Sequence, residues 1–256
     1  MMDMIVTSAP TWLLVFARMG GLLGMNPLFA RRNIPGIVRA GLTFLMTVLI
    51  APNVADAGGI DGSLELAIGL LRELFVGFAC GFIFQIYYYM IFFAGDLMDT
   101  SFGLSMAKIF DAGTNIQMST SSNLLNILFV LYIFATDSHL LLIRIFTSSF
   151  QILPVGSVSL SPDAIQVFFE LFVDVFSMAL RLAIPFMAAE FVVELAMGVL
   201  MKLIPQIHVF VINIQFKILL GIILLLFFAS PVAAFLDNYM RAMLEDLQYA
   251  FLTLRP

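Results

Sequence analysis

Five ionisable side chains lie within one apolar stretch, residues 164–200, and no other residues in the sequence are placed so well for chemistry. They are Glu170, Asp174, Arg181, Glu190 and Glu194. The four carboxylates form two i,i+4 pairs, so on a helix the two members of each pair share one face. Adjacent carboxylates repel each other unless a proton or a cation lies between them. The arrangement could therefore relay protons or cations, or basic side chains could neutralise it.

Ion pairing is the interpretation that we favour, because charges inside membrane proteins commonly pair with one another. An ionised group at bilayer depth costs at least about 2.5–3.5 kcal/mol on insertion scales, so these side chains must face protein or water rather than lipid. Arg181, Lys202 and Lys217 are nearby candidate partners. The alternative is a proton-coupled secondary transporter that uses the intramembrane carboxylates, and both interpretations stay open at this point.

Other kinds of site find little support. The single cysteine, Cys80, allows no internal disulfide. Two histidines, His139 and His208, are too few for a typical zinc cluster and are interpreted as hydrogen-bonded corner residues. The sequence contains no phosphate-binding loop, no G-x-S-x-G motif and no dinucleotide fingerprint. We therefore predict no catalytic residue, no metal and no cofactor, and we expect that the protein is not an enzyme.

The composition indicates a polytopic membrane protein or a subunit buried inside a membrane assembly. Of its 256 residues, 62% are hydrophobic and 11% are charged, whereas soluble proteins carry about 25% charged residues. The mean hydropathy is +1.06. A water-soluble fold cannot bury so much apolar surface, so soluble enzymes, disordered proteins and nucleic-acid-binding proteins are excluded. The net charge of −5 separately argues against binding to a phosphate backbone.

Six apolar stretches are predicted to form the helices that position the charged residues. A bilayer core about 30 Å thick needs about 20 apolar residues as a helix. The clearest stretch, residues 74–95, has 22 residues without a charge. It contains Gly77 and Gly81, whose spacing lets another helix approach closely. Gly20 and Gly24, earlier in the chain, have the same spacing. The stretches are residues 12–29, 40–51, 74–95, 124–136 with 140–153 as a bent helix or hairpin, 164–200 and 203–236.

Residues 96–123 differ in composition from these apolar stretches. They are rich in Ser, Thr, Asn and Gly, yet they contain the bulky residues Met106, Ile109, Phe110 and Met118. A structureless connection of this length within a compact fold is usually functional or disordered. The bulky apolar residues argue against simple disorder. We therefore predict a functional loop.

Basic residues near the ends of spans indicate the side of the membrane on which a loop lies. Three arginines between positions 31 and 39 place their loop in the cytoplasm. The next loop carries Asp56 and Asp61 without a basic residue, so it is expected outside. Lys202 indicates that the corner between the last two long stretches lies inside.

Four local patterns follow one another along the chain, and the most specific is Pro205-Gln206-x-x-Val209-Phe210 with Lys202 and Lys217 on either side. The first pattern is Phe16-x-Arg18-x-Gly20-Gly21, followed by Pro27, Pro35, Arg39 and Pro52. The second is Glu73 with Gly77 and Gly81, followed by Ala94-Gly95-Asp96 and Gly103-Leu104-Ser105. The third is His139, followed by Ser149-Phe150 and Pro154. Together they resemble the FliR/SctT family of type III secretion export gates across essentially the whole chain. The chain departs from the family at Ala112, Ser138, His208 and Gln215.

The resemblance implies an all-α membrane protein of long, bent and hairpin helices that forms one subunit of a helical export-gate ring. Residues 1–165 would be FliP-like and would include the loop 96–123, whereas residues 166–256 would be a FliQ-like helical hairpin with a C-terminal helix. One copy would complete a ring with FliP and FliQ, with FlhB and FlhA as neighbours. The ring would lie in the bacterial inner membrane, within the flagellar basal body, and would pass unfolded flagellar export substrates.

The resemblance also implies roles for particular residues. The loop 96–123 lies where the family has a pore plug, so Met106, Ile109, Phe110 and Met118 would supply the bulk that blocks ions. A cytoplasmic corner that contacts FlhB would consist of Lys202, Pro205 and Gln206, because proline disfavours a straight helix there. The charges at Glu170, Asp174, Arg181, Glu190 and Glu194 would lie at subunit interfaces. Energy for export would come from elsewhere in the apparatus.

Overall fold

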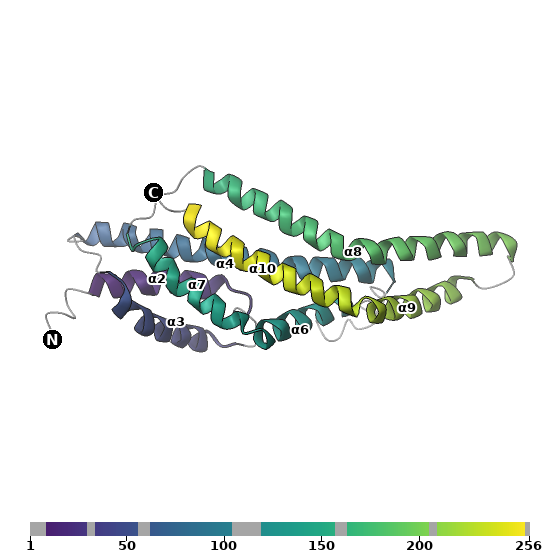
Figure 1. Ribbon diagram of the computed structural model, residues 1–256, viewed down its shortest axis with the longest axis horizontal. Coiled ribbons are helices and arrows are strands. Elements are labelled where there is room, and N and C mark those ends of the chain that lie inside the picture. Colours follow the sequence, from purple (N-terminus) through teal and green to yellow (C-terminus); the bar gives the residue numbers. More distant parts are fainter. Residues whose placement is uncertain are drawn as a thin grey trace. The chain divides into compact units, whose positions relative to one another are not determined.

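The structure is a computed structural model that describes residues 9–29, 34–55, 62–103, 119–156, 163–204 and 209–253. These residues form helices and the short turns between them, and they include no β-strand (Figure 1). The prediction of an all-α fold is confirmed. In chain order the described helices are α2 (Ala9–Met25), α3 (Gly36–Ile50), the 3-10 helix η1 (Ala51–Asn53), α4 (Ser63–Ser101), α6 (Thr120–Ala135), α7 (Ser138–Ile152), α8 (Asp163–Leu203), α9 (Val209–Phe227) and α10 (Ala229–Thr253).

The chain divides into two compact units that do not follow its order. Unit 1 comprises Met1–Tyr87, Asp137–Phe172 and Arg241–Pro256. Unit 2 comprises Tyr88–Thr136 and Val173–Met240. The long helices α4, α8 and α10 therefore contribute residues to both units.

Helices α2 and α4 touch through glycines in unit 1. A Cβ atom on Gly77 would lie 2.1 Å from the carbonyl oxygen of Arg18, and one on Gly21 would lie 2.5 Å from that of Leu74. A Cβ on Gly81 would lie 2.7 Å from the Cβ of Met25. The predicted close approach at Gly77 and Gly81 is thus explained by α2. In α2 itself the contact residue is Gly21, because a Cβ on Gly24 would meet nothing within 4 Å among the described residues.

Unit 2 has similarly close contacts around the end of α4. A Cβ on Gly95 would lie 2.4 Å from the backbone nitrogen of Ser122 in α6. Just after α4, the buried ring of Phe102 packs edge-on against Phe186 of α8, with ring centroids 6.2 Å apart. A Cβ on Gly221 of α9 would lie 2.9 Å from that same ring. Gly95 of α4 and Gly221 of α9 therefore leave room for the backbone of Ser122 and for the ring of Phe102 in the unit 2 core.

The edges of the predicted loop 96–123 are helical. Helix α4 continues to Ser101, and α6 already begins at Thr120. Asp99 explains the second boundary, because its buried carboxylate accepts the backbone N–H of Ser121 in the first turn of α6, at 3.0 Å from Oδ2. A negative group at this end of a helix is stabilised by the helix dipole.

The apolar stretch 203–236 does not form a single helix. Helix α9 ends at Phe227, and α10 begins at Ala229 and continues to Thr253. Pro231 provides the physical reason, because it has no N–H to donate to the carbonyl four residues earlier and is best accommodated in the first turn of a helix. The apolar composition of the stretch does not mark this break.

Two helical stretches are long and apolar enough to cross a membrane, Gly36–Asn53 and Ser63–Ser101. Two further pairs, Thr120–Ala135 with Ser138–Ile152 and Gln215–Phe227 with Ala229–Thr253, qualify if each bent pair counts as one span. The bend that was expected around Asp137 is confirmed, and Asp137 itself has a positive φ of 55°. The helices thus suit a membrane protein with two to four spans among the described residues.

Candidate functional site

A buried ion pair joins α2 to α4 in unit 1. The Nε atom of Arg18 lies 2.6 Å from Oε2 of Glu73, and both side chains are 0% exposed. Taking two charges out of water is costly unless their geometry is good and further hydrogen bonds satisfy them. The pair therefore depends on the other polar groups that surround it.

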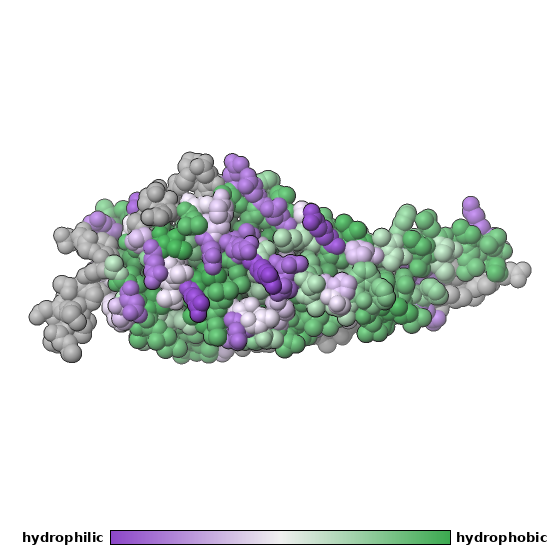
Figure 2. Space-filling model, viewed as in Figure 1, coloured by the Kyte–Doolittle hydropathy of each residue, from purple (hydrophilic) through white to green (hydrophobic). Residues whose placement is uncertain are grey.

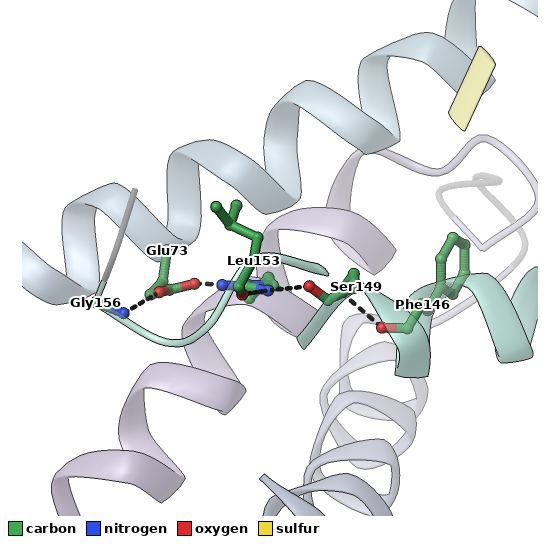
Figure 3. Close-up of polar contacts among 6 residues, drawn as sticks. Glu73, Phe146, Ser149, Leu153 and Gly156 are labelled. Carbon is green, nitrogen blue, oxygen red and sulfur yellow. Dashed lines mark hydrogen bonds and ion pairs between the residues drawn. The ribbon is translucent and has the colours of Figure 1, made fainter. Parts of the chain in front are cut away.

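Those groups come from the end of α7 and the turn that follows it. Arg18 Nη1 donates to the carbonyl oxygens of Ser149, at 3.2 Å, and Leu153, at 3.0 Å. Glu73 Oε1 accepts the backbone N–H of Gly156 at 2.8 Å. Figure 3 shows Glu73, Gly156, Leu153 and Ser149 within one network of polar contacts. One buried ion pair thus fastens the C-terminal end of α7 to α2 and α4.

The aromatic ring of Phe150 completes the surroundings of the Arg18 side chain. The guanidinium carbon lies 4.3 Å from the ring centroid, a distance typical of a cation–π contact. The Nη2 atom, by contrast, has no hydrogen-bond partner among the residues that the structure describes. Because the carboxylate and guanidinium are both sealed from solvent, the arrangement is suited to holding helices together.

The prediction from sequence missed this pairing. Arg18 and Glu73 were both recognised as parts of family patterns, but they were not connected with each other. They are 55 positions apart, and no local spacing rule links residues so distant. Arg18 interrupts one apolar stretch and Glu73 directly precedes another. This shared setting is the signal that could have connected them.

A second cluster of charges links α8 to α9 in unit 2. Lys217 Nζ lies 2.7 Å from Oε1 of Glu190, and it also forms a salt bridge with Glu194. The side chains of Lys217 and Glu190 are each 16% exposed, whereas that of Glu194 is 50% exposed. One lysine faces two carboxylates, so the cluster keeps a net charge of −1 if all three groups are ionised. Lys217 was among the predicted partners, and the structure places it between the two glutamates.

The remaining predicted charges of α8 lie on its surface. Glu170 accepts a hydrogen bond from Gln166 Nε2 at 2.8 Å, and both side chains are exposed. Asp174, Arg181 and Lys202 are exposed as well. None of these charged groups forms an ion pair within the part of the chain that the structure describes. Among the predicted charges of α8, the described residues therefore place only Glu190 and Glu194 next to a basic side chain.

Several predicted positions lie outside the described residues. These are Met106, Ile109, Phe110 and Met118 of the expected plug, together with Pro205 and Gln206 of the expected corner. The expected plug residues lie between Gly103 and Ser119, where the described chain stops and resumes. The expected corner residues Pro205 and Gln206 lie between α8, which ends at Leu203, and α9, which begins at Val209.

Comparison with known proteins confirms the family resemblance over nearly the full chain. Residues 9–243 match the family described as "Bacterial export proteins, family 1". The flagellar biosynthetic protein FliR of Bacillus subtilis is 25% identical over 250 residues, which cover 96% of each chain. FliR of Escherichia coli is 27% identical over 86% of this chain and 85% of its own. FliR of Pectobacterium carotovorum is 28% identical over 91% of this chain and 90% of its own. The chain therefore belongs to family 1 of the bacterial export proteins, the FliR family.

Proposed function

We propose that the protein is a non-enzymatic core subunit of the flagellar type III export gate, where it forms a channel for unfolded substrates together with FliP and FliQ. Membership of the FliR family and the membrane-spanning helices support a role in flagellar protein export at a membrane. The proposal adds the partners FliP and FliQ, contacts with FlhB and FlhA, and a place in the inner membrane at the basal body.

The observation that carries the proposal is the mixed surface of α8. Glu170, Asp174 and Arg181 are exposed there, next to the apolar side chains of Phe169, 67% exposed, and Phe172, 42% exposed. Lipid suits the phenylalanines but not the charges, since an ionised group at bilayer depth is costly. Water suits only the charges. Neighbouring protein subunits suit both, because they can bury apolar area and pair the charges.

The same mixture is visible over a wider surface. Figure 2 shows hydrophilic residues set among largely apolar ones on the face that it draws. Large exposed apolar patches rimmed by polar residues are typical of protein or membrane contacts. An assembled ring in which helices face other helices would account for this pattern.

Purification tests the assembly directly. A tagged copy of the chain, extracted in mild detergent from cells that produce FliP- and FliQ-like proteins, should be recovered in a complex with both. A proton-coupled carrier would instead be stable alone or as a homo-oligomer, and that result would overturn the proposal.

We propose further that the loop within residues 96–123 plugs the channel. Its mixed composition suits neither lipid nor a free linker, and Asp99 and Ser121 hold its described ends together. Replacing Met106, Ile109, Phe110 and Met118 by serine keeps the loop length but removes the bulk. The assembled complex should then conduct ions in planar bilayers. Conductance equal to that of the unaltered complex would mean that the plug assignment is wrong.

The segment that joins α8 to α9 is proposed as a cytoplasmic corner that contacts FlhB. Lys202 is exposed in the last turn of α8, and a basic residue favours the inner side of a membrane. Gln206→Cys should crosslink to FlhB in cells, and Cys80, which is 1% exposed, should not interfere. Asn53→Cys is the matched control and should react only from the outside. Labelling of Gln206→Cys only from the periplasm would contradict the assignment.

A further inference from the structure

The middle of α4 exposes a narrow strip of large side chains. Among the fifteen residues from Glu73 to Tyr87, three are exposed, and all three are phenylalanines. Phe75 is 47% exposed, Phe78 41% and Phe82 46%. Gln85 follows them and is half-buried. Successive positions of this set lie three, four and three residues apart, so the four side chains line one face of the helix.

Other parts of unit 1 cover the remaining faces of α4 in this region. Helix α2 lies against Gly77, where a Cβ atom would be 2.1 Å from the carbonyl oxygen of Arg18. The hydroxyl of Tyr87 donates to the carboxylate of Asp246 in α10 at 2.6 Å. Such contacts leave the phenylalanines as the only exposed side chains of α4 between positions 73 and 87.

Helix α3 shows how a broadly exposed helix differs from this strip. Nine of its fifteen residues are exposed, against three of fifteen in the middle of α4. Fluid acyl chains fit a broad apolar surface of any spacing. A row with the spacing three, four, three is instead the seam along which one helix packs against another, with their axes about +20° apart. The narrow strip on α4 therefore fits one helix better than it fits a bilayer.

Gln85 gives a second reason for a protein neighbour. Its Oε1 atom is buried and has no hydrogen-bond partner among the residues that the structure describes. The last torsion of a glutamine side chain is soft, so the amide can turn its oxygen toward the strip. An acyl chain offers no donor, whereas a polar side chain on a neighbouring helix does. One polar residue within an apolar seam also fixes the register of the two helices.

We infer that the strip formed by Phe75, Phe78, Phe82 and Gln85 binds one helix of a neighbouring gate subunit. The phenylalanine rings need room opposite them, so the partner helix presents small residues, which are common at helix contacts in membranes, and one hydrogen-bond donor at the level of Gln85. Two copies of this chain related by a two-fold axis would bring the same phenylalanines together, so the partner is a different polypeptide. The inference rests on the proposed function for the identity of that subunit.

Photocrosslinking in the intact complex tests which molecule occupies the strip. p-Benzoylphenylalanine in place of Phe82 keeps an aromatic ring there, and irradiation should join it to a different polypeptide, identified by mass spectrometry. Phe44 of α3, 62% exposed, is the matched control, and the same probe there should give several-fold less protein adduct. Adducts at position 82 with lipid alone or with a second copy of the chain, or a yield no higher than at position 44, would overturn the inference alone. An unaltered chain that forms no complex would overturn the proposed function as well.

The variant Gln85→Leu separates a role in assembly from a role in the fold. It should lower recovery of the complex several-fold, whereas the unfolding midpoint of the isolated chain should not fall, because Oε1 lacks a partner within the described residues. Asn126→Leu is the matched control. Its Oδ1 also lacks a partner in the described part of the chain, but its side chain is 6% exposed, so no neighbouring subunit reaches it. Full recovery of the complex with Gln85→Leu, or a midpoint that falls together with recovery, would overturn the inference.

Discussion

The two charged clusters of the molecule are built in opposite ways. Arg18 and Glu73 are both 0% exposed, and they bind backbone groups of their own unit. Lys217 faces two glutamates, and one of them, Glu194, remains 50% exposed. The first cluster therefore completes itself within the chain. The second leaves charge at a surface, where another polypeptide could pair with it. The difference teaches that an ion pair between apolar helices can be enclosed within the chain or can leave charge at its surface.

The largest effect is expected from Arg18→Met. This substitution leaves Glu73 buried without its cation, a loss of about 3–5 kcal/mol for a broken buried pair. It also removes the guanidinium donor from the carbonyls of Ser149 and Leu153, although the Ser149 carbonyl still accepts the backbone N–H of Leu153 at 2.9 Å. The unfolding midpoint of the purified protein in detergent should fall accordingly.

The double variant Arg18→Met with Glu73→Met is the control for this prediction. Replacing both members of a buried ion pair by apolar residues is often neutral, whereas removing one is not. The double variant should therefore be more stable than Arg18→Met alone. If the two variants unfold at the same midpoint, the network does not act through its charge.

A smaller effect is expected from Lys217→Met. The change leaves Glu190 and Glu194 side by side without a cation. A hydrogen bond between charged groups such as that to the mostly buried Glu190 is worth about 1.5–3 kcal/mol, whereas the contact with the half-exposed Glu194 contributes about 0–1 kcal/mol. Water reaches this cluster, so the loss should be less than for Arg18→Met. A midpoint lower than that of Arg18→Met would reverse the comparison.

Neutralising both glutamates should affect assembly more than the chain itself. The double variant Glu190→Gln with Glu194→Gln removes the mutual repulsion as well as the attraction to Lys217. We expect reduced recovery of the FliP–FliQ complex, with motility lost in proportion, because the exposed charge is proposed to face a neighbouring subunit. A complex that assembles in full but loses proton-dependent transport would favour a carrier.

The smallest effect is expected from Glu194→Gln alone. Exposed ion pairs contribute about 0–1 kcal/mol, and half of this side chain is exposed. Glu190→Gln is the matched comparison at 16% exposure, and it should lower the unfolding midpoint more. Equal shifts for the two variants would show that exposure does not distinguish them.

The sequence predicts the helices well where composition alone decides them. Apolar runs predicted α2, α3, α4 and α8, although α4 and α8 proved longer than the runs themselves. The continuation of α4 to Ser101 was not visible, because its last turns are polar and are stabilised by contacts such as that of the Asp99 carboxylate with the backbone N–H of Ser121. Tertiary packing therefore extended a helix beyond its apolar sequence.

The sites were predictable only in part. Lys217 could be proposed as a partner because it is one of few basic residues near the carboxylate pairs. The Arg18 network could not, because three of its members are backbone groups whose chemistry no side chain reports. The exposed and buried faces of α3 also depend on which side α2 occupies. Composition predicts that this stretch is apolar but not which residues face outward.

The order of synthesis gives the Arg18 network a further consequence. Arg18 leaves the ribosome 55 residues before Glu73, and 131 and 135 residues before the carbonyls of Ser149 and Leu153. At about 5–20 residues per second, the first interval lasts several seconds and the later ones last roughly 7–27 seconds. A guanidinium without partners costs about 2.5–3.5 kcal/mol at bilayer depth on insertion scales. Newly made α2 is therefore expected to be less stable in lipid before the rest of its site has been translated than afterwards.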